Sequence, residues 1–144
     1  MAAIAARLTV ANSPLFDGVT VLTEDAQDLE TQINKAIGEI GMLILIGEPS
    51  WTSDGQARRV ATGRVASEIA IGEMPTLWRT DNSKPRAQAL ATEVIRQVLG
   101  LAPKGFTPIE LERARLVPHK TRHIWEVVLA SQLVFWPDAV VRTP

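Results

Sequence analysis

The sequence contains no cysteine and no tyrosine, and its 15 basic residues nearly balance its 16 acidic residues. The absence of cysteine excludes disulfides, thiolate catalysis and cysteine-ligated zinc. A formal net charge of -1 gives no global field that would attract nucleic acid or an anionic membrane. The apolar runs, such as Met42–Ile46, are far too short to span a bilayer. The N-terminal stretch carries Arg7 and has no long apolar segment, so we interpret it as mature protein and not as a signal peptide.

Motifs of reactive chemistry are also lacking: the sequence has neither a GxxxxGK(S/T) phosphate loop nor a GxSxG nucleophile elbow. Glu68 and Glu73 are separated by an odd number of residues on a predicted strand, so we expect solvated carboxylates on opposite faces. His119 and His123 have a spacing that can bind metal on a helix, but Pro118 and the strand pattern that follows favour solvated turn histidines. We therefore expect no enzymatic activity, no metal and no cofactor.

The hydrophobic spacing predicts one α+β domain, in which two helices pack on a mainly antiparallel sheet in the order α-β-β-α-β-β. A chain of 144 residues is long enough to bury a substantial core. We expect helices at about 23–41 and 83–99, and strands at 42–46, 64–73, 109–117 and 122–135. Residues 23–144 form the predicted domain, and residues 1–22 are expected to be an N-terminal extension or arm.

Capping residues predict where the helices begin and end. Thr23 or Asp25 is the expected N-cap of the first helix, and Gly38 and Gly41 lie where that helix should stop. Pro85 falls in the expected first turn of the second helix, where proline is tolerated.

The strand patterns predict three further features. The run at 42–46 is apolar on both faces, which is typical of a central strand that is covered on both sides. Residues 47–63 should form a long hairpin that can extend as a β-arm, and imperfect alternation predicts a β-bulge near Glu112 and Arg113. The long strand at 122–135 is expected to be an edge strand that protrudes or bends.

The tryptophans divide between core and loops. Trp125 lies in a strand pattern and should belong to the core. Trp51 and Trp78 lie in loops next to prolines, where a large aromatic side chain either anchors an interface or packs as a lid on the protein's own core. The turn at 74–82, centred on Trp78 and Arg79, is therefore a candidate contact surface.

Charged residues suggest a second contact surface. Basic residues gather in the predicted hairpin and its exit: Arg58, Arg59 and Arg64. The start of the first helix is acidic: Glu24, Asp25, Asp28 and Glu30. The hairpin cluster is either simply solvated, or it meets an acidic neighbour or lines a DNA channel. Our hypothesis is that the hairpin cluster and the basic stretch at 113–122 meet the acidic surface of a neighbouring copy.

Three segments carry a resemblance to a known family: DAQDLETQINKAIGEIG followed by MLILI, the turn EMPTLWR, and the closing HIWEVVLASQLVF. Over residues 23–136 the chain resembles the small tail-terminator and neck proteins of tailed bacteriophages. The resemblance implies an α+β fold and a non-enzymatic homohexameric ring at the head-proximal end of the tail tube. Such a ring stops tube growth and joins the tail to the head connector.

The partners and the location also follow from this resemblance. The implied partners are other copies of the chain, the tail-tube protein and the head–tail connector, with DNA passing through the lumen without sequence-specific binding. The implied location is the tail or neck of the virion, after assembly in the host cytoplasm, with no membrane association.

Other functions remain open from the sequence. The protein could be another tail, neck or baseplate adaptor, or a small nucleic-acid-binding α+β module that uses the basic loop. Gly38–Gly41 is similar to the GxxG loop of a KH domain, but it carries Glu39 and an apolar strand follows it. A small enzyme with a site spread over several loops is a further alternative.

Overall fold

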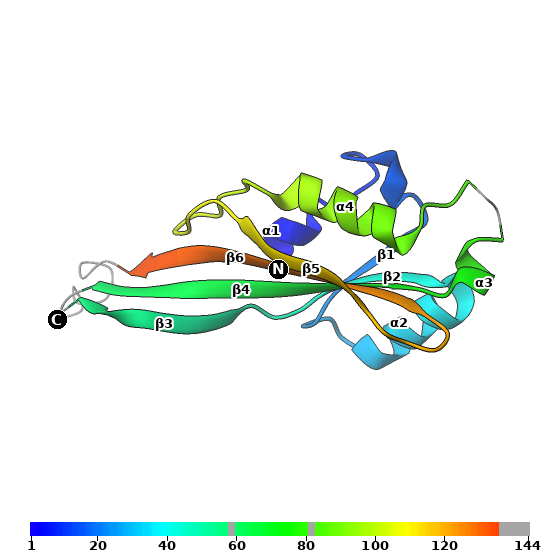
Figure 1. The fold of residues 1–144 in the computed structure, drawn as a ribbon, viewed down its shortest axis with the longest axis horizontal. Coiled ribbons are helices and arrows are strands. Elements are labelled where there is room, and N and C mark those ends of the chain that lie inside the picture. Colours follow the sequence, from blue (N-terminus) through cyan, green and yellow to red (C-terminus); the bar gives the residue numbers. More distant parts are fainter. Residues whose placement is uncertain (58–59, 81–82, 136–144) are drawn as a thin grey trace.

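The computed structural model describes residues 1–57, 60–80 and 83–135 and contains a six-stranded sheet with helices on both faces (Figure 1). The strands are β1 Thr20–Thr23, β2 Met42–Ile46, β3 Ser50–Ala57, β4 Val60–Glu73, β5 Glu110–Val117 and β6 His123–Phe135. The α-helices are α1 Ala2–Ala5, α2 Leu29–Lys35, α3 Pro75–Trp78 and α4 Ala87–Val98. A 3-10 helix, η1 Pro14–Phe16, and a π-helix, η2 Ala36–Ile40, complete the set for the described residues. The predicted α+β class is confirmed.

The strand order is β1-β2-β4-β6-β5, and β3 also pairs with β4. Every pairing is antiparallel except that of β1 with β2, which is parallel. Both β2 and β3 pair with the side of β4 that faces away from β6, because β6 pairs along nearly the whole of β4. The sheet edge is therefore stepped, since β1 lies one strand further out than β3.

The two faces of the sheet have separate cores, as expected for a sheet with helices on both sides. On the α4 face, α1, η1 and α4 cover apolar residues of β2, β4 and β6, among them Ile44, Ile71 and Val127. On the α2 face, Leu22 and Leu43 pack with α2 and η2. The residues of β2 are nearly all buried, which confirms the prediction of a central strand that is covered on both sides.

The predicted hairpin arm and β-bulge are both present. β3 pairs with β4 from Ser50 opposite Ala66 to Ala57 opposite Val60, and β3, β4 and β6 continue together past the helices (Figure 1). The register between β5 and β6 shifts at Glu112, where the bulge was predicted. The prediction that β6 is an edge strand is wrong, because β6 lies between β4 and β5.

The first long helix begins later than its capping residues predicted. Thr23 is the last residue of β1, and its Oγ1 donates a hydrogen bond to Asp25 Oδ1 at 2.6 Å, so neither residue caps the helix. α2 starts after Asp28, whose φ of 52° is left-handed. Gly38 lies inside η2, and Gly41, with φ 85°, ends it. A Cβ at Gly41 would lie 2.7 Å from Leu77 Cβ, so this position requires glycine for two reasons.

The second long helix also begins later than predicted, at Ala87, so Pro85 precedes it. Its first N–H does not rely on a local side-chain cap, because Ala87 N donates a hydrogen bond to Glu73 Oε1 at 3.1 Å. Ala87, Leu90 and Val94 are buried at helical spacing, as the apolar stripe of this segment predicted.

The N-terminal segment, expected to be an extension or arm, contributes Ile4, Leu8 and Phe16 to the core on the α4 face. Leu8 and Phe16 are as well buried as residues of the central strands. Among the described residues, no helix is long and apolar enough to cross a bilayer.

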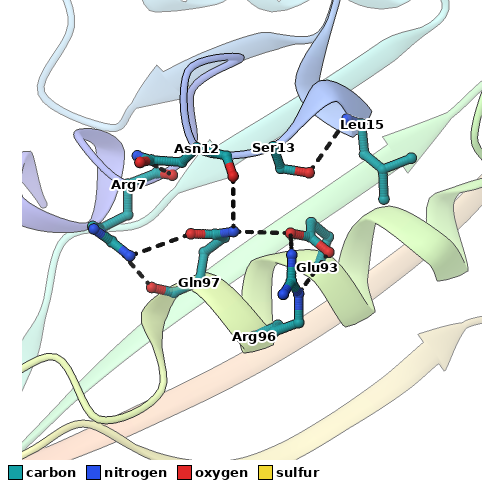
Figure 2. Close-up of polar contacts among 7 residues, drawn as sticks. All are labelled: Arg7, Asn12, Ser13, Leu15, Glu93, Arg96 and Gln97. Atoms are coloured by element: carbon teal, nitrogen blue, oxygen red, sulfur yellow. Dashed lines mark hydrogen bonds and ion pairs between the residues drawn. The ribbon is translucent and has the colours of Figure 1, made fainter.

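Polar side chains hold this N-terminal segment against α4 (Figure 2). Arg7 donates hydrogen bonds to the backbone and side chain of Gln97, both at 3.3 Å. Gln97 Nε2 in turn donates to Asn12 O at 3.4 Å and to Glu93 Oε1 at 2.9 Å. Arg96 pairs with Glu93 at 2.7 Å, and this contact is the main reason that the pKa of Glu93 is lowered to about 2.

Candidate functional site

The turn that was expected to contact a partner is packed against the protein's own core. The side chain of Trp78 is only 3% exposed, and its Nε1 donates a hydrogen bond to Pro85 O at 2.6 Å. The ammonium of Lys84 lies 4.7 Å from the centre of the indole ring. Of the two interpretations open from the sequence, the lid is therefore the one that the structure supports for Trp78.

Glu73 explains why this turn folds inward, and the expectation that Glu73 is a solvated carboxylate is wrong. The side chain is fully buried, and its Oε2 lies 2.6 Å from Arg79 Nε. Its Oε1 accepts the hydrogen bond from Ala87 N and lies 3.6 Å from His123 Nδ1. A buried carboxylate is stable only with such partners. Arg79 is therefore committed to an internal contact, and Glu73 links α3, α4 and β6.

A second group of charges lies on the α2 face of β4, β6 and β5. We call it the charged face, and it comprises Arg64, Glu68, Glu112, Arg113, Arg115 and Glu126. Glu126 Oε1 lies 3.0 Å from Arg113 Nη2 and 3.4 Å from Arg115 Nε. Arg64 forms an ion pair with Glu112 of the bulge, and this contact spans the intervening strand β6. All three arginines of the charged face are therefore paired with glutamates.

Glu68 and Glu126 share a hydrogen bond on the charged face. The hydrogen bond with Glu126, followed by burial and by the negative charge of Glu126, raises the pKa of Glu68. Burial opposes ionisation of Glu126, but hydrogen bonds from Glu68, Arg115 and Arg113 outweigh it and lower the pKa of Glu126. Of the two carboxyl groups, Glu68 therefore has the higher pKa. Sequence spacing missed this pair because it depends on the register between β4 and β6.

The outer strands of the sheet carry exposed apolar side chains. On β5, Leu111 is 41% and Leu116 53% exposed, and on β3 Trp51 is 51% exposed. The indole of Trp51 lies over Gly63, where an added Cβ would fall 1.6 Å from Trp51 Nε1. Trp125, predicted to be a core residue, is partly buried and packs against the core.

The predicted acidic and basic surfaces are placed only in part. Glu24, Asp25, Asp28 and Glu30 are all exposed, and only Glu30 lies within α2. Glu24 Oε2 accepts a hydrogen bond from Glu48 N at 2.6 Å. Arg64 is engaged with Glu112, whereas Arg58 and Arg59 lie outside the described residues.

The basic turn between β5 and β6 is the remaining part of the predicted basic stretch. His119 and Lys120 are exposed there, and Arg122 is partly buried. His119 Nδ1 accepts hydrogen bonds from the backbone N–H groups of Thr121 and Arg122. In residues 1–57, 60–80 and 83–135 there is no group of three or more side chains that could hold a metal ion.

The geometry defines a sheet with three features. At one end Glu73 is buried and paired with Arg79, one face carries paired arginines and glutamates, and the outer strands carry exposed apolar side chains. No family model and no curated protein matches the sequence. The fold is similar to that of a chain in the solved structure "Virion of native gene transfer agent (GTA) particle", with a TM-score of 0.54. That similarity covers 94% of this chain and 87% of the other, at 14% sequence identity. At this identity the similarity shows a shared fold.

Proposed function

We propose that the protein is a non-enzymatic structural component of a phage-like virion. The observation that carries this proposal is the similarity of fold, over 94% of the chain, to a chain of a gene transfer agent virion. More specifically, we propose that it acts as a tail terminator. In that role, copies of the chain form a ring, which we expect to be a hexamer, at the head-proximal end of the tail tube.

The arrangement of surfaces supports assembly. A head-to-tail ring needs two different patches on each subunit that complement one another. β5 forms one edge of the sheet, and β1 and β3 form the other. The acidic segment at 24–30 and the basic turn at 118–122 are a second pair of distinct surfaces. We propose that these two charged segments face each other between neighbouring copies.

The same proposal assigns the remaining partners. The ring stops growth of the tube by covering its terminal subunits, and its opposite surface receives the head connector. DNA passes through the lumen without sequence-specific binding. The pairing of all three arginines of the charged face with glutamates supports passage over tight binding, because a nucleic-acid site normally presents unpaired arginines and lysines to the phosphates.

Native mass spectrometry and negative-stain imaging of the purified protein test the ring. Rings of about six subunits support the proposal, and a monomer at every concentration contradicts it. Tube assembly in the presence of the protein separates a terminator from another adaptor, because only a terminator caps the tubes and limits their length. Salt-dependent binding of short DNA duplexes by the isolated protein would favour the nucleic-acid-binding alternative.

A further inference from the structure

β5 and β3 lie at opposite edges of one sheet, in the local order β3-β4-β6-β5. Among the described residues, β5 pairs only with β6, and β3 pairs only with β4. Each of these two strands has eight residues. An outer strand offers backbone N–H and C=O groups along its open side, which can pair with a strand of another chain.

From this geometry we propose that β5 of one copy pairs with β3 of the next, so that the sheet continues between subunits. The proposal deepens the ring proposed above and rests on it. Each step in the order β3-β4-β6-β5 is antiparallel, so β3 and β5 of one copy run in opposite directions. When neighbouring copies continue the sheet in the same orientation, β5 therefore meets β3 as an antiparallel partner.

The exposed apolar residues of the two strands face the same side of the sheet. Trp51 is opposite Val65 of β4, while Leu116 is opposite Trp125, which is in turn opposite Ile71 of β4. Val65 and Ile71 are six residues apart, so both point to the α4 face. Pairing Trp51 with Leu116 joins two half-exposed side chains into one apolar contact, and aromatic–aliphatic pairs of this kind stabilise sheets.

Charge disfavours the competing arrangement, in which β5 pairs with β5 of a second copy. Centring that pairing on the regular segment Arg113–Val117 would place Arg115 opposite Arg115. Shifting the centre to Ala114 would place Arg113 opposite Arg115. Like charges directly opposite one another destabilise a sheet, whereas β3 offers the neutral Thr52 opposite Arg115 when Trp51 is opposite Leu116.

This register displaces the next copy by six residues along the strands, or about 20 Å at roughly 3.3 Å per residue. The displacement suits the stepped edge, because it brings β1 of the next copy beyond the end of β5 instead of against its side. The acidic segment that follows β1, with Asp25 and Asp28, then lies at the basic turn that carries Lys120. A stagger between strands is also what allows a sheet to close into a barrel or ring.

Engineered cysteines test this register without background, because the chain has no cysteine of its own. The double variant carries Thr52→Cys and Arg115→Cys, both on the α2 face and away from Trp51 and Leu116. Under mild oxidation or with a short thiol-to-thiol linker, we expect a ladder of linked oligomers on non-reducing electrophoresis. An equal mixture of the two single variants should stop at linked dimers, since each copy then carries one cysteine.

The matched control pairs Thr52→Cys with Thr92→Cys, an exposed position on α4, and should give no ladder. Native mass spectrometry of the same samples reports assembly independently. Rings without a link between positions 52 and 115, or efficient linking of Arg115→Cys to itself, would overturn the edge pairing and leave the ring standing. A monomer at all concentrations would overturn both proposals.

Discussion

At one end of β4, Glu73 is buried among α3, α4 and β6, while at the other end β4 continues with β3 and β6 past the helices (Figure 1). At the first end the buried carboxylate of Glu73 is paired internally with Arg79. Along the outer strands, by contrast, Trp51 and Leu116 leave about half of their side-chain surface in water. We therefore expect stability to depend on the end at Glu73 and the proposed assembly to depend on the outer strands, so that each can be changed with little effect on the other.

The largest effect should come from Glu73→Ala, which removes the carboxylate and leaves Arg79 unpaired in a largely buried site. Loss of one partner of a buried ion pair costs about 3–5 kcal/mol. We expect a loss of stability near the lower limit, because Arg79 keeps some contact with solvent. The loss is measured as the change in the free energy of unfolding in urea. Glu68→Ala, on the same strand but on the charged face, is the control and should cost less than about 1 kcal/mol. Equal losses of stability in the two variants would contradict the distinction between the buried Glu73 and the exposed Glu68.

Acid should weaken the attachment of the N-terminal segment next. Because folding lowers the pKa of Glu93 from its usual 4.5 to about 2, the ionised carboxylate stabilises the fold above pH 4.5, and this contribution is lost as the pH falls toward 2. The full shift is equivalent to roughly 3–4 kcal/mol. Because Arg96 is largely exposed and solvent screens the pair, we expect a contribution of roughly 2–3 kcal/mol. Glu93→Gln should flatten this part of the profile of unfolding free energy against pH. An unchanged acid profile in the variant would show that Glu93 is not the group responsible.

Two glycine substitutions test how tightly the protein is packed at the end of the sheet near Glu73. Gly41→Ala should cost about 2 kcal/mol, since a Cβ there meets Leu77 and the backbone N of Trp78 in a left-handed conformation. Gly38→Ala, in open space within η2, should instead stabilise by roughly 0.5–1 kcal/mol. The temperature of thermal unfolding should therefore fall for Gly41→Ala and rise for Gly38→Ala, relative to the unsubstituted protein. A similar change in unfolding temperature for both variants would contradict the close contact inferred at Gly41.

The smallest effect on stability, with a large effect on assembly, is expected for Leu116→Gln. Leu116 is half exposed, so the free energy of unfolding of the monomer should change by no more than about 0.5 kcal/mol. The fraction of ring in native mass spectra should fall sharply, because the apolar contact with Trp51 of the next copy is lost. Val10→Gln, at another half-exposed apolar residue outside the sheet, should leave assembly intact.

Much of the scaffold could be predicted from local pattern, because alternation and helical spacing are properties of short segments. The bulge at Glu112 followed from imperfect alternation alone. The start of α2 was predicted too early because Thr23, a good capping residue, is used by β1 instead. The position of β6 was also missed, because length alone does not reveal which strands lie on either side.

The environment of Glu73 could not be predicted, because its partners come from three separate elements, α3, α4 and β6, that only the folded structure brings together. Trp78 was ambiguous for the same reason. A loop aromatic can face inward or outward, and the burial of Trp78 and its hydrogen bond to Pro85 O show that it faces inward. The pair formed by Glu68 and Glu126 needed the register of two strands that are distant in sequence. The interface roles of Trp51 and the acidic segment remain predictions.

The step between β1 and β3 has a consequence for solubility. Exposed strand edges recruit stray strands and promote aggregation, and natural sheets limit this by making their edges irregular. Here β1 projects one strand further out than β3. A long flat strand that approaches this edge therefore meets β1 before it reaches β3. A strand that ends early, as β5 does at Val117 before Pro118, can pair with β3 without colliding with β1. In the proposed ring, the outline of this edge therefore favours β5 of a second copy over a longer strand.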